Sequence, residues 1–349
     1  MVKVGVLGFA HGHVMSFGKN WMEHPDLGVK IVGGWDRDAE RCKKSCEALG
    51  ATPFAPADEL LASDIQAVVI TTETKFHPDM VELAAAAGKD IICYKPMALT
   101  MAGADRIVEA VKKHGVRFSM GWQMRCDPQN IKMKEIIESG KLGKLAMYRR
   151  RHALATQEMG NFESLWHADP DLNRDIFADD PSHPIDMMHW IFGMPETVQC
   201  EMSSVLNPKV PNDTGIALFK FKNGMIADIS CQFTTTAAEI GTEVYGSTGS
   251  IQQYFDDGPS TKLPHADRPG LKWYFSGDAD WTISDIPSPA GHGERIYNQG
   301  VQLAKFLCGG DHVCSAEDGR DSLRLVLACY VSARTGERVS VMDNRVYDI

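Results

Sequence analysis

The first third of the chain alternates short apolar segments with helical patterns, and this alternation constrains the fold more than any other feature. The apolar segments predict strands at Val2–Leu7, Val29–Trp35, Ala67–Thr71, Asp90–Tyr94 and Arg117–Met120. The helical patterns between them cover Val14–Glu23, Ala39–Leu49, Pro78–Ala87 and Ala102–His114. Strands that alternate with helices predict a parallel sheet joined by right-handed crossovers.

From Leu145 onward the pattern changes to strands joined by short turns. These strands are predicted at Leu145–His152, Thr197–Ser204, Ile216–Phe221, Met225–Phe233 and Glu243–Gly246. Asn223-Gly224 is a hairpin signal between two of them. Further helices are predicted at Pro184–Phe192, Glu294–Leu307 and Ala316–Thr335, and a surface loop at Asp256–Gly270. The pattern therefore predicts a second α/β domain with a mostly antiparallel, open sheet.

Length, charge and cysteine content limit the class of protein. The 349 residues are enough for two domains, and the net charge of −10 gives no general attraction to nucleic acid or anionic membranes. The short basic run Arg149-Arg150-Arg151-His152 is interpreted as a solvated strand end. We expect no signal peptide and no membrane span. Nine cysteines without a Cys-x-x-Cys pair suggest free thiols in a cytoplasmic protein.

The turn after the first predicted strand reads Gly8-Phe9-Ala10-His11-Gly12-His13. Dinucleotide-binding folds place Gly-x-Gly-x-x-Gly here, because glycines let the backbone approach the pyrophosphate at a helix N-terminus. This chain keeps the first glycine and has alanine at the second position. The position in the chain, between a strand and a helix, nevertheless favours a dinucleotide site and a Rossmann domain.

Asp36 ends the second predicted strand and is placed to accept hydrogen bonds from an adenosine ribose diol. Its negative charge opposes a 2′-phosphate and favours NAD over NADP. Arg37 is the complication, because a guanidinium there is able to bind that phosphate or stack on adenine. We therefore expect NAD as the cofactor, with NADP not excluded.

His11 and His13 have the spacing of a metal-ligand pair. A helix N-terminus disfavours a cation through its dipole, and no carboxylate–cysteine cluster lies nearby in the sequence. We expect these histidines to pack beside the diphosphate or nicotinamide, or to be structural, and we expect no metal site.

A lysine and an Asp-x-x-x-His pair supply groups for proton transfer. Lys95 lies at the end of a short strand, in Tyr94-Lys95-Pro96, and Asp179 and His183 follow about eighty-five residues later. If they meet across a cleft, an ammonium, a carboxylate and an imidazole surround one small polar molecule. The structural alternatives are a surface lysine and a histidine that caps the next helix.

These motifs together resemble the glucose-fructose oxidoreductase/inositol dehydrogenase (Gfo/Idh/MocA) family over nearly the whole chain. The matching segments are Val4–His13, Gly34-Trp35-Asp36-Arg37, Ile70-Thr71-Thr72 with His77, Ala87-Gly88-Lys89, Tyr94-Lys95-Pro96, Asp179-x-x-x-His183 with Asp186 and Trp190, Tyr245–Ser250, and Glu317–Gly336. The resemblance implies a Rossmann domain over residues 1–122 and a C-terminal substrate-binding and oligomerisation domain over residues 123–349. It also implies that the last helix packs back near the first domain and that the active site lies between the domains.

Three departures from the family pattern bear on the substrate and on activity. Tyr94 replaces the usual glutamate of Glu-Lys-Pro, so a partner expected to orient Lys95 is missing or supplied elsewhere. Glu73 stands where proline is usual. Asn173-Arg174-Asp175-Ile176-Phe177 replaces a glycine triplet before Asp179, and its bulk is expected to reshape the substrate pocket.

The resemblance implies oxidation or reduction of a carbinol carbon on a sugar, polyol or inositol-like substrate. Lys95 would stabilise the developing alkoxide, His183 would take the hydroxyl proton, and Asp179 would bind an adjacent hydroxyl. Residues implied at the cofactor site, besides the glycine turn, Asp36 and Arg37, are Thr71, Thr72, His77 and Lys95. Residues expected at the substrate site, besides the trio, are Arg125 and Trp166.

Two alternatives remain open at this point. One is an NAD-dependent glycosidase of the same family, and the other is a non-catalytic NAD or sugar sensor, favoured by the altered glycine turn and by Tyr94. An apolar open sheet face must be covered, so a homodimer or homotetramer is expected.

Overall fold

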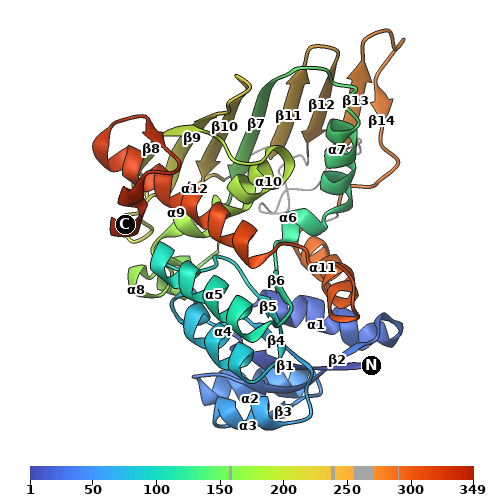
Figure 1. The fold of residues 1–349 in the computed structure, drawn as a ribbon, viewed down its shortest axis with the longest axis vertical. Helices are drawn as coiled ribbons and strands as arrows, with labels where there is room; N and C mark the ends of the chain where they lie inside the picture. Colours follow the sequence, from blue (N-terminus) through green and yellow to red (C-terminus); the bar gives the residue numbers. More distant parts are fainter. Residues whose placement is uncertain (157–158, 237–239, 255–269, 290) are drawn as a thin grey trace. The chain divides into compact units, whose positions relative to one another are not determined.

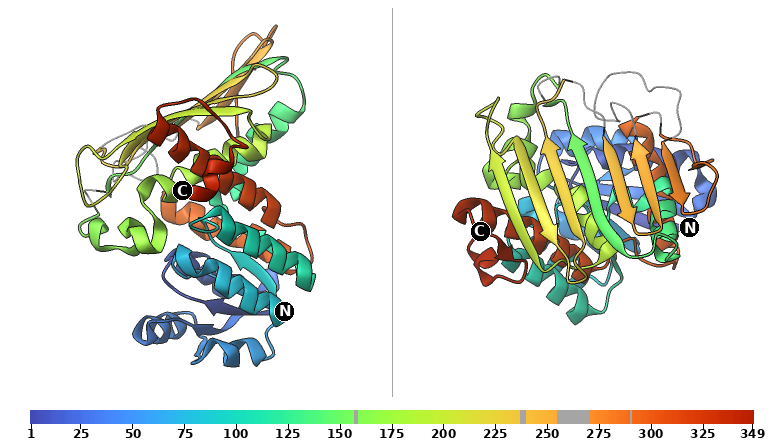
Figure 2. Two further views of the ribbon diagram at one scale, coloured as in Figure 1. Left: turned by 60° about the vertical axis from the view of Figure 1, so that its left-hand side comes forward. Right: turned by 90° about the horizontal axis from the view of Figure 1, so that it is seen from above.

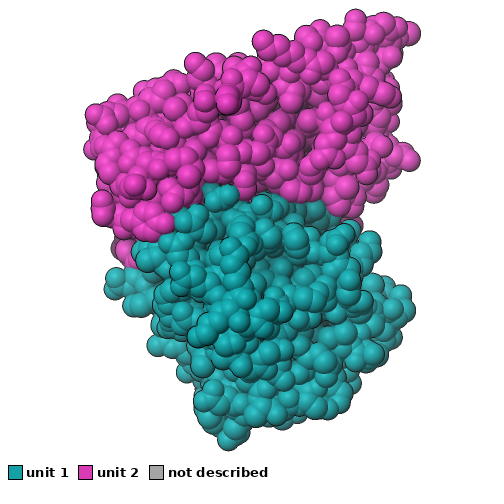
Figure 3. Space-filling model, viewed as in Figure 1, with its two compact units in different colours: residues 1–126, 171–173, 295–323 teal, residues 127–170, 174–294, 324–349 magenta. Residues whose placement is uncertain are grey.

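The computed structural model describes the chain except for residues 157–158, 237–239, 255–269 and 290. The predicted loop Asp256–Gly270 therefore lies, apart from Gly270, outside the described residues. The chain forms two compact units (Figure 3). Unit 1 contains residues 1–126, 171–173 and 295–323, and unit 2 contains residues 127–170, 174–294 and 324–349.

Unit 1 is built on a six-stranded sheet in the order β3-β2-β1-β4-β5-β6 (Figure 1). Its strands are β1 (Val2–Leu7), β2 (Val29–Trp35), β3 (Thr52–Pro53), β4 (Ala67–Ile70), β5 (Asp90–Cys93) and β6 (Phe118–Met120). All five pairings are parallel, as predicted. The strand order reverses between β1 and β4, which is the switch point where open α/β sheets bind ligands.

The helices of unit 1 agree with the predicted segments to within one residue at each end. They are α1 (His13–Glu23), α2 (Ala39–Ala48), α4 (His77–Ala86) and α5 (Met101–His114), with the short α3 (Ala57–Ala62) and α6 (Gln123–Cys126) in addition. Local signals set the ends of α5. Thr100 accepts from the Gly103 N–H at 3.1 Å, and Gly115 terminates the helix in the left-handed conformation.

The late helix α11 (His292–Leu307) completes the core of unit 1. Leu303 and Phe306 belong to the same buried cluster as Phe17 and Trp21 of α1. The Trp21 indole donates to the Gly300 carbonyl at 2.8 Å, so the two helices are joined by a buried hydrogen bond as well as by apolar contacts. The core of unit 1 therefore depends on residues from both halves of the sequence.

Unit 2 contains a nine-stranded sheet in the order β14-β13-β12-β11-β7-β10-β9-β8-β15. Its strands are β7 (Leu145–Ala153), β8 (Thr197–Ser203), β9 (Thr214–Lys220), β10 (Ile226–Gln232), β11 (Gly241–Gly246), β12 (Gly249–Tyr254), β13 (Leu271–Phe275), β14 (Thr282–Ile283) and β15 (Val339–Ser340). β7 and β10 are parallel, and the other pairs are antiparallel. The prediction of a mostly antiparallel sheet is confirmed. So is the hairpin at Asn223-Gly224, where Gly224 has φ +90°.

One face of this sheet carries helices and the other does not (Figures 1 and 2). The helices described in unit 2 are α7 (Pro128–Glu138), α9 (Ile176–Asp179), α10 (Ser182–Phe192) and the second half of α12 (Ala316–Thr335), and α8 (Pro170–Asn173) lies at the boundary of the units. Along β9, Ala217 and Phe219 are buried, whereas Ile216 and Leu218 are 42% and 37% exposed. The face without described helices is therefore partly apolar.

The basic run in β7 differs from the solvated strand end that the sequence predicts. Arg150 is fully buried and donates to the Thr242 hydroxyl at 2.7 Å. Arg149 points to the opposite face, where its guanidinium lies 2.7 Å from Asp228. Side chains alternate across a strand, so the run is divided between two faces. This explains why it makes no continuous basic patch.

Among the described residues, no helix combines the length and the apolar content that a membrane span requires.

Candidate active site

The turn after β1 is held closely against the end of β4. Gly8 has φ +85°, and a Cβ added there would lie 2.4 Å from Thr72 Cγ2 and 2.7 Å from Thr72 Cα. The His11 N–H donates to the Thr71 carbonyl at 2.9 Å. Only glycine fits this position without strain. The first glycine of the motif, the one that the chain retains, is thus required by the packing of two strand ends.

The beginning of α1 has the features of a diphosphate site. Gly12 is the N-cap, no described side chain caps the helix, and its first turn contains no acidic residue. A Cβ added at Gly12 would meet no atom within 4 Å, so the backbone faces open space. The positive end of a helix dipole favours a pyrophosphate. The residues from Gly8 to His13 therefore fit NAD, even though alanine replaces the second glycine.

We expect Gly8→Ala to destabilise the protein by about 2–5 kcal/mol, because left-handed strain adds to a backbone clash. Urea unfolding measures this loss. Gly12→Ala is the matched control, since its Cβ enters open space. It is expected to leave the unfolding free energy within about 1 kcal/mol but to weaken NADH binding measured by fluorescence titration. Equal destabilisation by both substitutions would contradict the proposed difference between the two glycines.

Asp36 lies at the end of β2, as predicted, and its carboxylate is fully hydrogen-bonded. Its side chain is 1% exposed. It accepts from the backbone N–H groups of Phe9 at 2.5 Å and Asp38 at 2.8 Å. Arg41 binds it through Nε at 2.8 Å and Nη2 at 2.7 Å. The sequence assigns the oxygens of Asp36 to a ribose diol. In the structure Arg41 already donates to both of them, so a bound ribose would have to displace this guanidinium.

Arg41 and Glu73 are site residues that the sequence interpretation did not connect. Arg41 Nη2 also donates to Glu73 Oε1 at 3.0 Å, so Glu73 extends the ion pair of Asp36. In the sequence, Glu73 stands out only because it replaces a usual proline. Arg37 lies with its guanidinium carbon 3.8 Å from the centre of the Phe76 ring, which orients a flat cation beside the same loop.

His11 and His13 pack against each other and against Tyr94. The two imidazole ring centres are 4.3 Å apart, and His11 lies 5.1 Å from the Tyr94 ring. The described residues contain no group of three His, Cys, Asp or Glu side chains arranged for a metal ion. Both histidine rings thus lie beside the ring of Tyr94, and their position next to a diphosphate or nicotinamide stays a prediction.

Tyr94, which replaces the expected glutamate, points into the core of unit 1. Its hydroxyl donates to Gln299 Oε1 of α11 at 2.6 Å, and its ring stacks on Phe17 at 5.5 Å. Burial raises the pKa of the Tyr94 phenol well above its ordinary value, so the group stays a neutral donor. Tyr94 thus joins β5 to α11 and does not take over the role of the missing carboxylate.

Tyr94→Phe is expected to cost about 1–3 kcal/mol of unfolding free energy, because it leaves the buried Gln299 oxygen without its donor. The double variant Tyr94→Phe/Gln299→Met removes both polar partners and is expected to recover most of this loss. Thermal or urea unfolding of the two variants tests this. A double variant less stable than Tyr94→Phe would show that the hydrogen bond is not the source of the effect.

His77 connects the loops that follow β4 and β5. Its Nδ1 lies 2.8 Å from the Pro96 carbonyl, and its Nε2 lies 3.1 Å from the Thr72 carbonyl. The side chain is fully buried, and burial lowers the pKa of its imidazole. His77 therefore positions the segment that contains Lys95, which is itself only 3% exposed.

In unit 2, Asp179 and Trp166 are brought together by a residue that the sequence did not indicate. His167 Nδ1 lies 2.9 Å from Asp179 Oδ2, and its ring stacks on Trp166 with ring centres 3.9 Å apart. Asp179 ends α9 and is 4% exposed. The predicted substrate residues Asp179 and Trp166 thus share one neighbour, His167.

His183 lies in the first turn of α10 and is 2% exposed. The preceding Asp180 pairs with His152 Nε2 at 2.8 Å, and this buried contact anchors the start of α10 to β7. Consecutive aspartates thus bind two different histidines. The segment from Asp179 to His183, which joins α9 to α10, is therefore held by two contacts within unit 2, one with His167 and one with His152.

Arg125 lies in unit 1, where it is 5% exposed and its Nη1 is 3.6 Å from Asp318 Oδ2. The structure thus groups the predicted cofactor residues and Lys95 with Arg125 in unit 1. It groups Asp179, His183 and Trp166 in unit 2.

Comparison with known proteins agrees with these features. A family model described as an oxidoreductase family with an NAD-binding Rossmann fold matches residues 2–122, and the model of the GFO/IDH/MocA C-terminal domain matches residues 130–252. The D-apiose dehydrogenase of Paraburkholderia graminis is 26% identical over 324 residues, which cover 90% of this chain and 84% of that protein. The inositol 2-dehydrogenase/D-chiro-inositol 3-dehydrogenase of Shouchella clausii is 28% identical over 78% of this chain and 77% of its own.

Among solved structures, a levoglucosan dehydrogenase in complex with NADH and levoglucosan has the same fold, with a TM-score of 0.84 at 20% identity. The similarity covers 98% of this chain and 100% of that one. The two family models together span more than half of the sequence. The chain therefore belongs to the GFO/IDH/MocA family of oxidoreductases, with an NAD-binding Rossmann domain at its N-terminal end.

Proposed function

We propose that this protein is an NAD-dependent dehydrogenase that transfers a hydride between nicotinamide and a carbinol carbon of a sugar, polyol or inositol-like substrate. NAD supplies the hydride acceptor at its nicotinamide ring. The observation that carries the proposal is the buried Lys95, two residues after the end of β5. It follows the carboxyl end of a parallel strand, where α/β folds bind ligands. Lysine is rarely buried to this extent in folded proteins unless it is paired.

Lys95 is assigned the role of stabilising the alkoxide that forms when the hydroxyl loses its proton. An ammonium group in a water-poor site interacts with developing negative charge more strongly than it does in water. His77 supports this assignment because it fixes the loop through the Pro96 carbonyl at 2.8 Å. The backbone next to Lys95 is therefore held in place by His77.

His183 is assigned the role of the base, and Asp179 that of a hydrogen-bond acceptor for a second substrate hydroxyl. His167 is a positioning residue in this scheme, because its contact with Asp179 at 2.9 Å sets the orientation of that carboxylate. Trp166 stacks on His167 and offers an apolar surface of the kind that sugar rings contact. The proposal requires Lys95, Asp179 and His183 to act on one substrate.

The substrate class rests on the names of the relatives, which are dehydrogenases of D-apiose, inositol and levoglucosan. The decisive experiment incubates the purified protein with NAD and a panel of these compounds, and follows NADH at 340 nm. A second series with NADP tests the specificity attributed to Asp36. Turnover of at least one polyol with NAD supports the proposal.

Two other results would favour a function other than that of a dehydrogenase. Release of an aglycone from glycosides without net NADH formation would indicate the glycosidase chemistry. NADH binding without turnover of any compound, unchanged in His183→Ala, would indicate a sensor. Absence of dinucleotide binding would contradict both NAD-dependent enzyme assignments.

We also propose that a second copy of the chain covers the sheet face without described helices, giving a homodimer or homotetramer. Ile216, Leu218 and Ile226 are 42%, 37% and 42% exposed on adjacent strands of that face. Asp228 and Arg149 lie beside them and pair with each other. Charged substitution of Leu218 is expected to produce monomers in analytical ultracentrifugation.

A cytoplasmic location is proposed from the cysteines. All nine are free, and eight of them are buried. Free thiols are typical of a reducing compartment.

A further inference from the structure

Three charged side chains of unit 1 form one cluster after the carboxyl ends of two strands. Asp36 follows β2, Glu73 follows β4, and Arg41 lies in the first turn of α2. β2 and β4 are the two neighbours of β1 in the sheet. The Phe9 N–H, in the turn after β1, donates to Asp36 at 2.5 Å. The cluster therefore lies beside the turn that fits the diphosphate.

One nitrogen of Arg41 joins the two carboxylates. Its Nη2 lies 2.7 Å from Asp36 Oδ1 and 3.0 Å from Glu73 Oε1. Its Nε donates to the other oxygen of Asp36 at 2.8 Å. The two carboxylates thus flank a single donor group. Two neighbouring ribose hydroxyls are also donors, and in the place of this guanidinium they would reach one carboxylate each.

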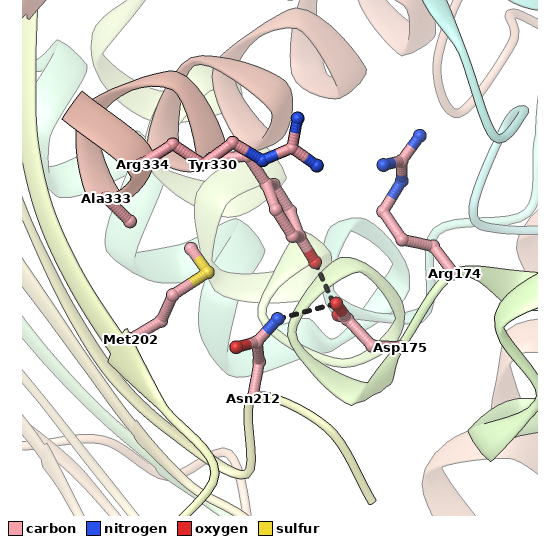
Figure 4. Close-up of a pocket in the computed structure, with 7 residues that line it drawn as sticks. All are labelled: Arg174, Asp175, Met202, Asn212, Tyr330, Ala333 and Arg334. Carbon is pink, nitrogen blue, oxygen red and sulfur yellow. Dashed lines mark hydrogen bonds between the residues drawn. The ribbon is translucent and has the colours of Figure 1, made fainter.

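Glu73 is a buried carboxylate that is only half bonded. It is 8% exposed, and its buried Oε2 meets no hydrogen-bond donor in the described part of the chain. Asp175 of unit 2 offers a comparison, because it is 5% exposed and Tyr330 and Asn212 donate to its two oxygens (Figure 4). Buried polar atoms are normally bonded as those of Asp175 are. Glu73 Oε2 therefore indicates a donor that the described residues do not supply.

The backbone at Glu73 does not explain why this residue is a glutamate. Its φ is −59° and its ψ is 145°, a conformation that proline also adopts. Proline is the usual residue at this position in the family. The carboxylate is therefore what distinguishes this chain here.

Arg41 is the member of the cluster that is able to move. Its side chain is 31% exposed, whereas that of Asp36 is 1% exposed. Asp36 is also held by the backbone N–H groups of Phe9 and Asp38. A guanidinium on a flexible stem is able to leave the two carboxylates without breaking any of these backbone contacts. Arg41 thus occupies a place that a ligand with two donors would take.

We propose that Asp36 and Glu73 form a two-carboxylate site for the adenosine ribose diol of NAD, and that Arg41 fills this site until the cofactor binds. Glu73 would accept one hydroxyl through Oε2, and Asp36 the other through the oxygens that Arg41 releases. Two carboxylates repel a 2′-phosphate more strongly than Asp36 alone. Glu73 is thus a further specificity-determining residue. The inference rests on the NAD binding that the proposed function requires, and not on hydride transfer.

Fluorescence titration of the full chain with NADH and with NADPH tests this inference. The preference is the dissociation constant of NADPH divided by that of NADH. Glu73→Gln is expected to weaken NADH binding about tenfold, because a charged acceptor is lost. The same variant is expected to lower the preference at least tenfold, because the repulsion of the 2′-phosphate falls as well. Both constants are measured on one sample, so a loss of folded protein does not alter their ratio.

Arg41→Met is expected to change the preference in the opposite direction. NADH would bind at least as tightly as to the parent chain, because the group that competes with the ribose is removed. The preference would rise, since no guanidinium remains to pair with a 2′-phosphate. Glu40→Gln is the matched control, because it removes the same charge from an exposed residue beside Arg41 on α2. Its preference is expected to stay within about twofold of the parent, since solvent and salt screen an exposed charge.

Two results would overturn the inference. One is a Glu73→Gln preference equal to that of Glu40→Gln, and the other is an Arg41→Met variant that binds NADH as weakly as Glu73→Gln does. Absence of NADH binding to the parent chain would overturn it together with the proposed function. The expected preferences without turnover of any substrate would contradict the dehydrogenase assignment alone.

Discussion

His183→Ala is expected to lower kcat by about 10²–10⁴-fold, the contribution that a positioned general base typically makes. NADH affinity is expected to be unchanged, because the proposal gives His183 a role in proton transfer and none in dinucleotide binding. Steady-state kinetics on the substrate found in the panel, together with NADH fluorescence titration, separate the two effects.

His189→Gln is the matched control for this variant. His189 lies on the same helix, α10, and is also buried, at 9% exposure. It is expected to retain kcat within about threefold in the folded protein, since it is given no part in proton transfer. Equal loss in both variants would show that the packing of α10, rather than the His183 imidazole, governs turnover.

Lys95→Met is expected to lower kcat by about 10²–10³-fold, the typical cost of removing one group that stabilises an oxyanion. Methionine has a similar length and suits the 3% exposed position, so the fold is expected to persist. Lys95→Arg retains the charge with a different geometry and is expected to recover only part of the rate. Kinetics of both variants, normalised to folded protein by circular dichroism, provide the measurement.

A Lys95→Met variant with full activity would remove Lys95 from the mechanism. Lys95 is also among the residues implied at the cofactor site, so NADH fluorescence titration of the same variant is needed beside the kinetics. A loss of kcat with unchanged NADH affinity assigns the effect to the chemistry.

The sequence predicted the parallel sheet well because its strands are buried on both faces. Ala67–Ile70 and Asp90–Cys93 read as continuous apolar segments, and all four residues of the first are buried. Strands such as Gly249–Tyr254 do not show in the sequence because Ser250, Gln252 and Gln253 interrupt the apolar pattern. Ser250 and Gln252 lie on the partly exposed face, whereas Gln253 is buried and donates to Asn130 at 3.0 Å. Short helices such as Ile176–Asp179 have too few residues to show a period.

Candidate site residues can be proposed from the sequence where a motif is local, whereas contacts between distant residues cannot. The glycine turn, Asp36 and the Asp-x-x-x-His pair each lie within a few residues. The hydrogen bond from Tyr94 to Gln299 crosses 205 residues, so no spacing indicates it. The contact of His167 with Asp179 does not show in the sequence for a related reason, since it depends on the short helices α8 and α9 that connect the two residues. Sequence alone therefore showed that Tyr94 is unusual but not what the residue contacts.

The late helix α11 has a consequence for how the protein is made. It closes the core of unit 1 against Phe17 and Trp21. In the sequence, however, residues 127–294 separate it from β6 and α6, and of these only residues 171–173 belong to unit 1. Ribosomes add about 5–20 residues per second, so the first domain waits roughly 10–30 s for its last helix. During that interval its apolar surface has no native cover. The newly made N-terminal half is thus expected to expose apolar surface until α11 has left the ribosome.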